Sequence, residues 1–386
     1  TTKIPSPTYL KHNTRTAMML ESAIPSHLQK PRTCPMSMPT DYTPPFPSYC
    51  ARFPTPMSNL VMAVIGAHYP SKAVFSTTSI EKIKSFMTAP ACTTPSSFWE
   101  TTSVVDKRGF YNIAIIVYWP SSSSFQTWKS DSGFEEWWSS IDREIESHGW
   151  FQEVLLPSVD RFETVFSNNE VPEGAANMRE KISGEMGEHA YWGSMRDRLA
   201  AAQDDRLEGE KWSAPNSNRT ANGAHTYANE KSKRVRIPGK KNLCVIRSGQ
   251  DWSATLPDER KLYLETMHPV LIKGMTFLRD EGKGIGCYAN NLWDVIDSST
   301  YEANLDKTYG LGFFDDLSSL ECWSKSHQTH IDIFGGFLMY AKKLNNVLSL
   351  RLFHEVYVLE EEQQFFEYIG CHEETGMVNA LWTGDA

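Results

Sequence analysis

The side chains in this sequence with the clearest capacity for chemistry are His327, His330 and His354. The apolar periodicity of residues 318–343 predicts one long helix, with His327 and His330 on its apolar stripe. Residues 349–358 (SLRLFHEVYV) are rich in β-branched and aromatic side chains, which predicts a strand carrying His354 beside a second apolar surface. One histidine on an apolar face is usually a hydrogen-bonded core residue. A group of them with polar residues nearby indicates a functional site.

Two kinds of site fit such histidines. An imidazole that projects into an apolar cavity can hold haem iron from one side, while an acid, a hydroxyl and a guanidinium act on a ligand at the other side. The haem would be non-covalent, because the sequence has no CxxCH motif. Alternatively, His327 and His330, at i, i+3 spacing, could begin a zinc or non-haem iron site. The spacing alone leaves both alternatives open.

Other common catalytic motifs are absent or out of context. The glycines of GKGIG (Gly282, Gly284 and Gly286) follow a predicted helix and precede a predicted strand, the reverse of a dinucleotide fingerprint, and so indicate a cap and turn. The sequence has no phosphate-binding GK[ST] loop, no HExxH and no GxSxG. These absences argue against the usual nucleotide-binding and hydrolase classes.

The predicted elements that position the histidines repeat one pattern in the two halves of the chain. The first half has strands at 60–67, 111–118 and 161–166 with helices at 79–87 and 133–146; the second has strands at 243–247, 286–296 and 349–358 with helices at 258–280 and 318–343. We therefore predict an α+β fold that is a tandem duplication of a ferredoxin-like module, of the dimeric α+β barrel type. In this alignment Glu163 and His354 occupy matching places on the last strands and face a shared interior.

The composition also suggests boundaries for these halves. Residues 1–57 are proline-rich and predict an extended arm, of which 1–18 is an extension outside the fold. Residues 58–199 form the first predicted half, 200–241 a linker or surface loop, and 242–386 the second half. Just before the linker, GEMGEHAYWGSMRDR combines aromatics, glycines and arginines, as expected of a segment that covers a site.

Length and charge narrow the class of protein. A chain of 386 residues with 40% hydrophobic residues can bury a large core. Its net charge of -9 argues against a nucleic-acid partner. The odd, scattered set of 7 cysteines favours a reducing, cytoplasmic compartment, and we predict no membrane segment because the longest apolar run is too short.

The sequence resembles the haem-containing aldoxime dehydratases, the phenylacetaldoxime dehydratase family, from about Met19 to the C-terminus. Departures are confined to the extension before Met19 and the loop at 203–232. The matching segments are ESAIPSHLQKPRT, YTPPFP, GEMGEHAYWGSMRDR, IRSGQDW, DERKLYL, WSKSHQTH, LRLFHEV and GCHEETGM.

The resemblance implies a haem-dependent lyase in which haem b lies between helix and sheet and the substrate nitrogen binds ferrous iron. The reaction is the conversion of an aldoxime, R-CH=N-OH, to a nitrile and water. The partner is thus a small aldoxime, and a homodimer is expected. The rival interpretations are a haem-binding sensor, which would need only the axial histidine and an apolar pocket, and a peroxidase-like haem protein of ferredoxin-like fold.

By the same resemblance, His330 in SHQTH is the axial haem ligand and His354 in LFHEV the distal general acid. Ser248 in IRSGQDW and Arg198 in MRDR lie around the oxime hydroxyl, although Arg198 could equally neutralise a haem propionate. Glu163 in RFETV assists, by keeping His354 protonated or by pairing with an arginine. The cavity walls are expected to include Val165, two residues along the strand from Glu163, and Phe337, two turns beyond His330.

Overall fold

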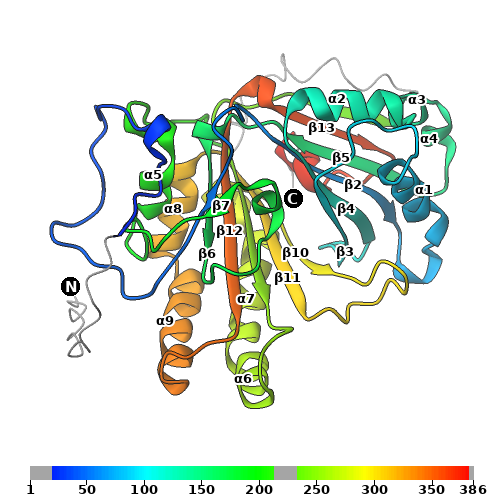
Figure 1. Ribbon diagram of the computed structural model, residues 1–386. Helices are drawn as coiled ribbons and strands as arrows, with labels where there is room; N and C mark the ends of the chain where they lie inside the picture. Colours follow the sequence, from blue (N-terminus) through cyan, green and yellow to red (C-terminus); the bar gives the residue numbers. More distant parts are fainter. Residues whose placement is uncertain (1–19, 213–232, 382–386) are drawn as a thin grey trace, which may run out of the picture.

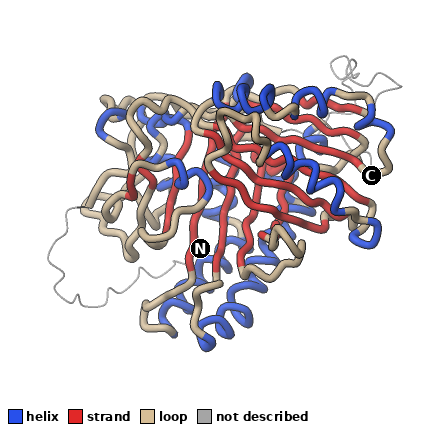
Figure 2. The backbone as a smooth tube through the Cα atoms, turned by 45° about the vertical axis from the view of Figure 1, so that its right-hand side comes forward, coloured by secondary structure: helices blue, strands red, loops and turns tan. Residues whose placement is uncertain are grey.

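The computed structural model describes residues 20–212 and 233–381. The predicted extension at 1–18 and much of the predicted linker therefore lie outside the described residues. Within the described residues, eleven strands form one antiparallel sheet, with helices gathered at its two ends (Figures 1 and 2). No helix in these residues has both the length and the apolar character needed to cross a lipid bilayer.

The strands of the large sheet are β2 (Val61–Tyr69), β3 (Phe98–Val105), β4 (Tyr111–Trp119), β5 (Gly149–Leu155), β6 (Phe162–Phe166), β8 (Arg234–Ile237), β9 (Leu243–Asp251), β10 (Cys287–Val295), β11 (Lys307–Phe314), β12 (Arg351–Leu359) and β13 (Gln364–Ile369). A separate two-stranded sheet pairs β1 (Ala51–Arg52) with β7 (Lys181–Ile182). The α-helices are α1 (Thr77–Met87), α2 (Ser122–Asp131), α3 (Phe134–Ser139), α4 (Asp142–Ile145), α5 (Ser194–Arg198), α6 (Pro257–Leu262), α7 (His268–Asp280), α8 (Leu317–Ser326) and α9 (Gln328–Lys343).

The order of the strands shows how the two halves are joined. The sheet runs β6-β12-β9-β11-β10-β3-β4-β2-β5-β13-β8, so that β12-β9-β11-β10 and β3-β4-β2-β5 are two quartets with the same internal connectivity. The strand that follows each quartet crosses to the other one: β6 follows β5 but pairs with β12, and β13 follows β12 but pairs with β5. The halves are thus held together by exchanged edge strands.

This topology corrects one detail of the predicted alignment. The counterpart of β12 is β5, and the counterpart of β6 is β13, so Glu163 on β6 and His354 on β12 do not occupy matching places in the two halves. They lie instead on neighbouring antiparallel strands, with Val165 opposite His354. The prediction went wrong because β5 was missed, which left β6 as the apparent last strand of the first half.

The predicted elements correspond to β2, α1, β4, the α3–α4 region, β6, β9, the α6–α7 region, β10, α8 with α9, and β12. Strands β3, β5, β11 and β13 were not predicted, nor was β8, whose residues fall in the predicted linker. Their inward positions include buried polar side chains such as Thr102 and Glu153, and β11 contains Gly310 and Gly312. Both features weaken the apolar alternation by which a strand is recognised.

The predicted long helix is in fact broken into α8 and α9 at His327. The backbone of His327 is extended, and its Nδ1 atom accepts a hydrogen bond from the backbone N–H of Thr329 as the N-cap of α9. Its ring stacks on Phe277 with the ring centroids 4.0 Å apart. His327 therefore has a structural role at the start of the helix that carries His330.

Alternation along β9 and β12 sends neighbouring side chains to opposite faces of the sheet. Arg247 and Glu355 are opposite each other in the register and fully buried between the halves, where Glu355 accepts a hydrogen bond from the hydroxyl of Tyr118 on β4. Their neighbours Ser248 and His354, also opposite each other, face the other side of the sheet. The buried network thus fixes which face of these strands is presented to helices α7 and α9.

Candidate active site

A large cavity lies between this face of the sheet and the helices. Its volume is about 450 Å³, within the ~300–1,000 Å³ usual for small-molecule sites. Strands β6, β9 and β12, helices α7 to α9 and the segment before α5 all contribute to its walls. Of the predicted site residues, the ones that line it are His330, His354, Ser248, Arg198, Val165 and Phe337.

The sheet wall of the cavity carries a row of residues in register. Val165 pairs with His354, His354 with Ser248, and Ser248 with Gly310 across β6, β12, β9 and β11. Directly paired residues in antiparallel strands point to the same face. A Cβ atom at Gly310 would lie 2.8 Å from the sulfur of Met275, so a larger residue there would force the side chain of Met275 on α7 to shift. The row places an imidazole and a hydroxyl side by side in the cavity.

Arg198, Glu163 and His354 form a buried charged group at the edge of this row. The Nε and Nη2 atoms of Arg198 each lie 3.0 Å from a carboxylate oxygen of Glu163, a bidentate pair. The Nε2 atom of His354 lies 2.9 Å from Nη2 of Arg198 and 3.1 Å from Oε1 of Glu163. Glu163 does not line the large cavity but a smaller one behind Arg198. The predicted acid and its two partners are therefore in direct contact.

Burial alone would raise the pKa of Glu163, but the charges of Arg198 and His354 and their hydrogen bonds hold it down to about 2. Because the pKa is depressed in the folded state, the stabilisation is present above the ordinary value of 4.5 and is lost as the pH falls towards 2. At ~1.4 kcal/mol per unit, the shift corresponds to on the order of 3 kcal/mol.

We therefore expect wild-type protein to lose more stability than Glu163→Gln between about pH 6 and pH 3, as measured by urea unfolding at a series of pH values. At neutral pH Glu163→Gln should be the less stable, since it leaves Arg198 buried without its counter-ion. The exposed Glu135→Gln is the control and should follow the wild-type curve. If the free energy of unfolding changed with pH in the same way for wild type and Glu163→Gln, the ion pair between Glu163 and Arg198 would not be formed in solution.

His330 lies on the helix wall, near the start of α9. Its ring makes an edge contact with Trp323 at 4.8 Å between centroids, and Trp192 lies at 6.2 Å on another side. Burial lowers the pKa of His330 to about 4, opposed by the backbone of Ser324. The Nδ1 atom is buried and makes no hydrogen bond of ordinary geometry. The imidazole is consequently neutral at physiological pH and suited to bind a metal.

Some residues of the cavity were not singled out from the sequence. His189 lines the cavity. Its pKa is lowered to about 3, mainly by burial and to a smaller extent by the charges of Arg198 and His354. The arm contributes Phe46, whose ring packs against Phe337 at 5.7 Å. The signals were indirect: the arm was predicted to be extended, and the segment containing His189 was predicted to cover a site.

Comparison with known proteins places the chain in a family. The model of the haem-containing dehydratase family matches residues 63–377. Aliphatic aldoxime dehydratase of Pseudomonas chlororaphis is 36% identical over 362 residues, covering 93% of this chain and 98% of that protein. The chain belongs to the haem-containing dehydratase family.

Other relatives agree with this placement. Phenylacetaldoxime dehydratase of Bacillus sp. (strain OxB-1) is 28% identical over 351 residues, covering 89% of this chain and 93% of that protein. A crystal structure of an aldoxime dehydratase in complex with butyraldoxime superposes with a TM-score of 0.82 at 35% identity, covering 93% of this chain and 96% of that one. The fold described above is therefore that of aldoxime dehydratases.

The cavity of this haem-containing dehydratase fits the cofactor of the family. Its walls are mainly apolar, it has the volume of a ligand site, and a neutral imidazole, His330, projects from one wall. The apolar side chains of α9 that line it, Ile333, Phe334 and Phe337, are only half-buried by protein atoms. Their remaining apolar surface is available to a flat, hydrophobic group.

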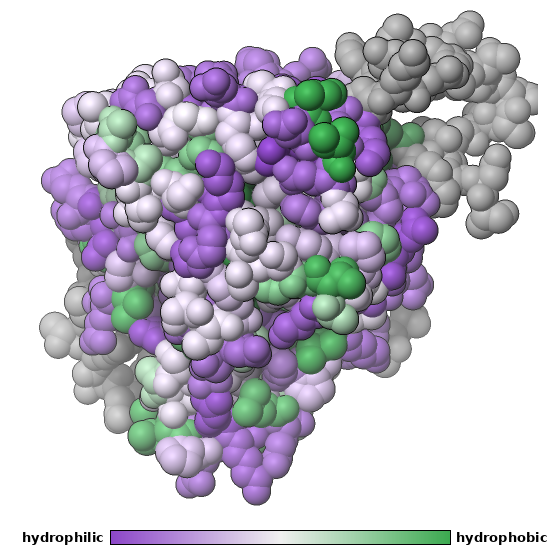
Figure 3. Space-filling view, turned by 90° about the vertical axis from the view of Figure 1, so that its right-hand side faces the viewer, coloured by the Kyte–Doolittle hydropathy of each residue, from purple (hydrophilic) through white to green (hydrophobic). Residues whose placement is uncertain are grey.

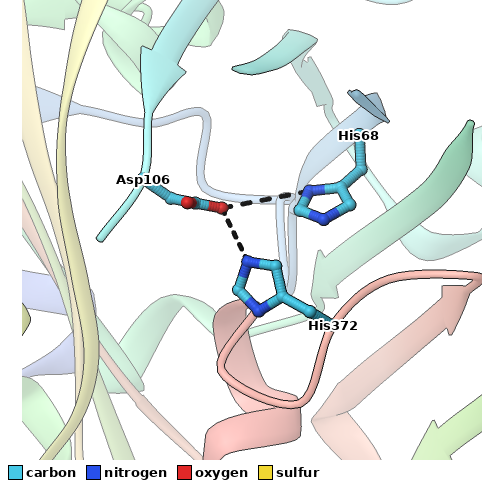
Figure 4. A group of neighbouring side chains, drawn as sticks. All are labelled: His68, Asp106 and His372. Carbon is cyan, nitrogen blue, oxygen red and sulfur yellow. Dashed lines mark hydrogen bonds and ion pairs between the residues drawn. The ribbon is translucent and has the colours of Figure 1, made fainter. Parts of the chain in front are cut away.

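A second group of histidines in this haem-containing dehydratase has a different character. Candidate ligand atoms of His68, Asp106 and His372 lie within 4.8 Å of one another (Figure 4). However, Nδ1 of His372 accepts a hydrogen bond from the backbone N–H of Glu374, so the proton of the neutral ring is on Nε2, which donates to Asp106 at 2.9 Å. His68 is held through Nδ1 by Oδ1 of Asn112 at 2.7 Å. The three side chains belong to a hydrogen-bonded network that joins the C-terminal segment to the first half, and Nε2 of His68 is buried there without a hydrogen-bond partner.

Proposed function

We propose that this protein is a haem-dependent lyase that dehydrates aldoximes to nitriles and water. The observation that carries the proposal is the cavity itself, where His330 stands on a helix wall and His354, Ser248 and Arg198 stand together on another. A sensor would need the histidine on the helix but not the polar group. The membership of the family and the names of its relatives favour the same reaction.

We further propose that haem b would bind between α9 and the sheet, where His330 would hold its iron. When bound, ferrous haem supplies a Lewis acid for the oxime nitrogen and electron density for cleavage of the N–O bond. Binding of the substrate in this way leaves its hydroxyl to be handled by the protein.

The geometry around His354 suits a group that gives and takes a proton. Its Nε2 atom lies beside an acceptor, Oε1 of Glu163, and a donor, Nη2 of Arg198, so both the imidazolium and the neutral ring have a partner. Nδ1 makes no hydrogen bond to any residue that the structure describes and is available to the substrate. It protonates the leaving hydroxyl as the N–O bond breaks, and the ring recovers a proton as the C–H bond of the aldoxime breaks. Atoms and charge balance, with water and a nitrile as products.

Ser248 has a smaller part in this proposal. It is opposite His354 in the register and lines the same cavity, so its hydroxyl can hold the oxime oxygen towards the imidazole. Because it positions an atom but supplies no proton, we expect Ser248→Ala to lower kcat by roughly 10-fold, less than loss of the acid. Single-turnover kinetics with the reduced holoenzyme measure this. A Ser248→Ala loss as large as that of His354→Ala would make the serine part of the proton transfer.

Arg198 acts on the substrate through Glu163 and His354. Its bidentate bond to Glu163 and its contact with His354 occupy most of its donors, and Nη1 donates to the backbone carbonyl of Glu188 at 2.9 Å. This favours a role of Arg198 through Glu163 and His354 over neutralisation of a haem propionate.

We interpret the fold as a tandem duplication of a ferredoxin-like module. The support is that β3-β4-β2-β5 and β10-β11-β9-β12 have the same strand order, with helices at the same two crossings. The proposed units are an arm at 1–57, halves at 58–199 and 242–386, and a linker at 200–241. The second half carries His330.

We also propose a cytoplasmic homodimer. The face of the molecule in Figure 3, at the α1–α4 end, carries scattered hydrophobic residues among hydrophilic ones. Helices α7 and α9 at the other end expose Ile272, Ile331, Leu338 and Met339. We place the contact between copies at the α7 and α9 end for testing, although Ile141 and Ile145 are exposed at the α1–α4 end as well. The measurement is the molar mass of wild type and of Ile331→Glu by light scattering. We expect the mass of a dimer for wild type and of a monomer for the variant, and a variant that stays dimeric would place the contact elsewhere.

The function is tested with reduced and oxidised holoenzyme and two probes, butyraldoxime and phenylacetaldoxime. The expected result is formation of the corresponding nitrile by reduced enzyme only, silenced by air and restored by dithionite. Equal rates of nitrile formation by the reduced and the oxidised enzyme would show that the reaction does not need ferrous iron. Consumption of hydrogen peroxide without nitrile formation would instead support a peroxidase-like protein.

A further inference from the structure

Helix α5 lies where three separate parts of the molecule meet, beside the arm that is drawn in dark blue in Figure 1. Its last three side chains diverge. Arg196 pairs with Glu321 on α8, with 2.7 Å between Nη2 and Oε2. Arg198 reaches the acid group on the sheet, and Asp197, between them, points to the arm. One short helix thus connects the arm, the helix wall and the sheet wall of the cavity.

Asp197 is 1% exposed, and its carboxylate accepts hydrogen bonds from the arm and from the loop before α5. Its Oδ2 atom accepts hydrogen bonds from the backbone N–H of Ser37 at 2.9 Å and of Met38 at 3.1 Å. The hydroxyl of Tyr191 donates to the same oxygen at 2.7 Å. Hydrogen bonds to a carboxylate are about twice as strong as bonds between neutral groups. Asp197 is therefore the main attachment of α5 to the arm.

The arm packs closely against this segment. Gly193, directly before α5, has φ +100°, and a Cβ atom there would lie 2.4 Å from Oγ of Ser37. Arg32 donates to the backbone carbonyl of Asp197 at 3.2 Å, and the hydroxyl of Tyr42 donates to the carbonyl of His189 at 2.8 Å. Close packing and directed bonds together leave the arm little freedom to slide.

We propose that Asp197 is a positioning residue for Arg198, and that through it the arm sets the geometry of the catalytic group. This rests on the proposed dehydratase function. Helix α5 has only 5 residues and no N-cap side chain, so it is too short to hold its own place and takes its position from its attachments. The guanidinium group of Arg198 must form a bidentate pair with Glu163 and also contact His354. Misplacement of a catalytic group by ~1 Å can lower the rate about 10²-fold.

The test is the Asp197→Asn holoenzyme, which keeps the shape of the side chain and can keep an acceptor oxygen at the Oδ2 position, but loses the negative charge that strengthens these three hydrogen bonds. We expect kcat for butyraldoxime to fall roughly 10- to 100-fold with a smaller change in KM and unchanged haem content. In the Arg198→Lys background the same substitution should have almost no further effect, because the residue through which it acts is already altered.

Glu259→Gln is the matched control. Glu259 is also buried and also accepts from two backbone N–H groups, those of Ser349 and Leu350, and from a tyrosine hydroxyl, that of Tyr340. It lies outside the cavity. For Glu259→Gln we expect a loss of thermal stability similar to that of Asp197→Asn, but a near-wild-type kcat. In the double variant with Arg198→Lys, the small effect on kcat should simply add to that of Arg198→Lys.

A readout that does not need turnover is the C–O stretching frequency of carbon monoxide on reduced enzyme, which senses nearby charges and donors. Asp197→Asn should shift it in the same direction as Arg198→Lys, whereas Glu259→Gln should not. Additive losses in kcat for Asp197→Asn and Arg198→Lys, or an unshifted frequency in Asp197→Asn, would overturn the proposal. If wild type formed no nitrile while the frequencies still moved together, the dehydratase function would fail and the positioning role would stand.

Discussion

Replacement of His330 by alanine should give a folded protein that retains no haem and therefore forms no nitrile. The reason is that His330 is the neutral imidazole on the helix wall of the cavity, with a pKa lowered to about 4 by burial. A neutral imidazole can coordinate iron without first losing a proton. The measurement is the haem-to-protein absorbance ratio after purification, with circular dichroism to show that the fold is intact.

The control for this prediction is His327→Ala, which removes a histidine from the same region. His327 caps α9 and stacks on Phe277, so its loss should cost stability, by about 1 kcal/mol for a helix cap, but leave haem bound. A His330→Ala protein that purified with full haem would contradict the assignment. If His327→Ala lost haem while His330→Ala retained it, His327 would be the haem ligand instead of His330.

Replacement of His354 by alanine should abolish the chemical step while leaving haem and substrate binding intact. Removal of a general acid typically costs ~10²- to 10⁴-fold, or about 3–5 kcal/mol in the barrier. The ring lies on the sheet wall, away from the proposed ligand His330, and is held by Glu163 and Arg198. The measurement is single-turnover nitrile formation, together with the absorption change on addition of aldoxime.

The comparison variant is His268→Ala, a partly buried histidine at the start of α7 that does not line the cavity. It should keep near-wild-type kcat. Near-normal nitrile formation by His354→Ala with full haem would refute the acid role and direct attention to Arg198 or to water as the proton source. Loss of the substrate-induced spectrum in His354→Ala would instead assign the residue to binding.

The sequence by itself determined a good deal of this protein. Its motif segments identified the family, and local patterns located His330 on a helix and His354 on a strand. Alternation within LRLFHEV and IRSGQDW also separates His354 from Glu355 and Ser248 from Arg247, because side chains on a strand alternate between faces. These are properties of short stretches of chain, and short-range sterics and hydrogen bonding are enough to encode them.

The resemblance predicted that Glu163 acts with His354 or an arginine, and the tertiary structure shows how the chain brings these residues into contact. Glu163 contacts His354 because β6 crosses to the edge of the other half, a pairing between strands nearly two hundred residues apart in the sequence. No local pattern specifies such a pairing, since it depends on which sheet edge is free after both halves have folded. His327 likewise changed from a residue on a helical stripe to a cap: its backbone is extended between α8 and α9, and its ring stacks on Phe277.

The position of α5 is the clearest case of this division. The local sequence GEMGEHAYWGSMRDR predicted only a segment that covers a site. That Asp197 takes the backbone N–H groups of Ser37 and Met38 while Arg198 takes Glu163 follows only from the path of the arm across the cavity. Buried charges must find partners wherever the fold supplies them, and here the partners come from segments about 160 and 35 residues away in the sequence.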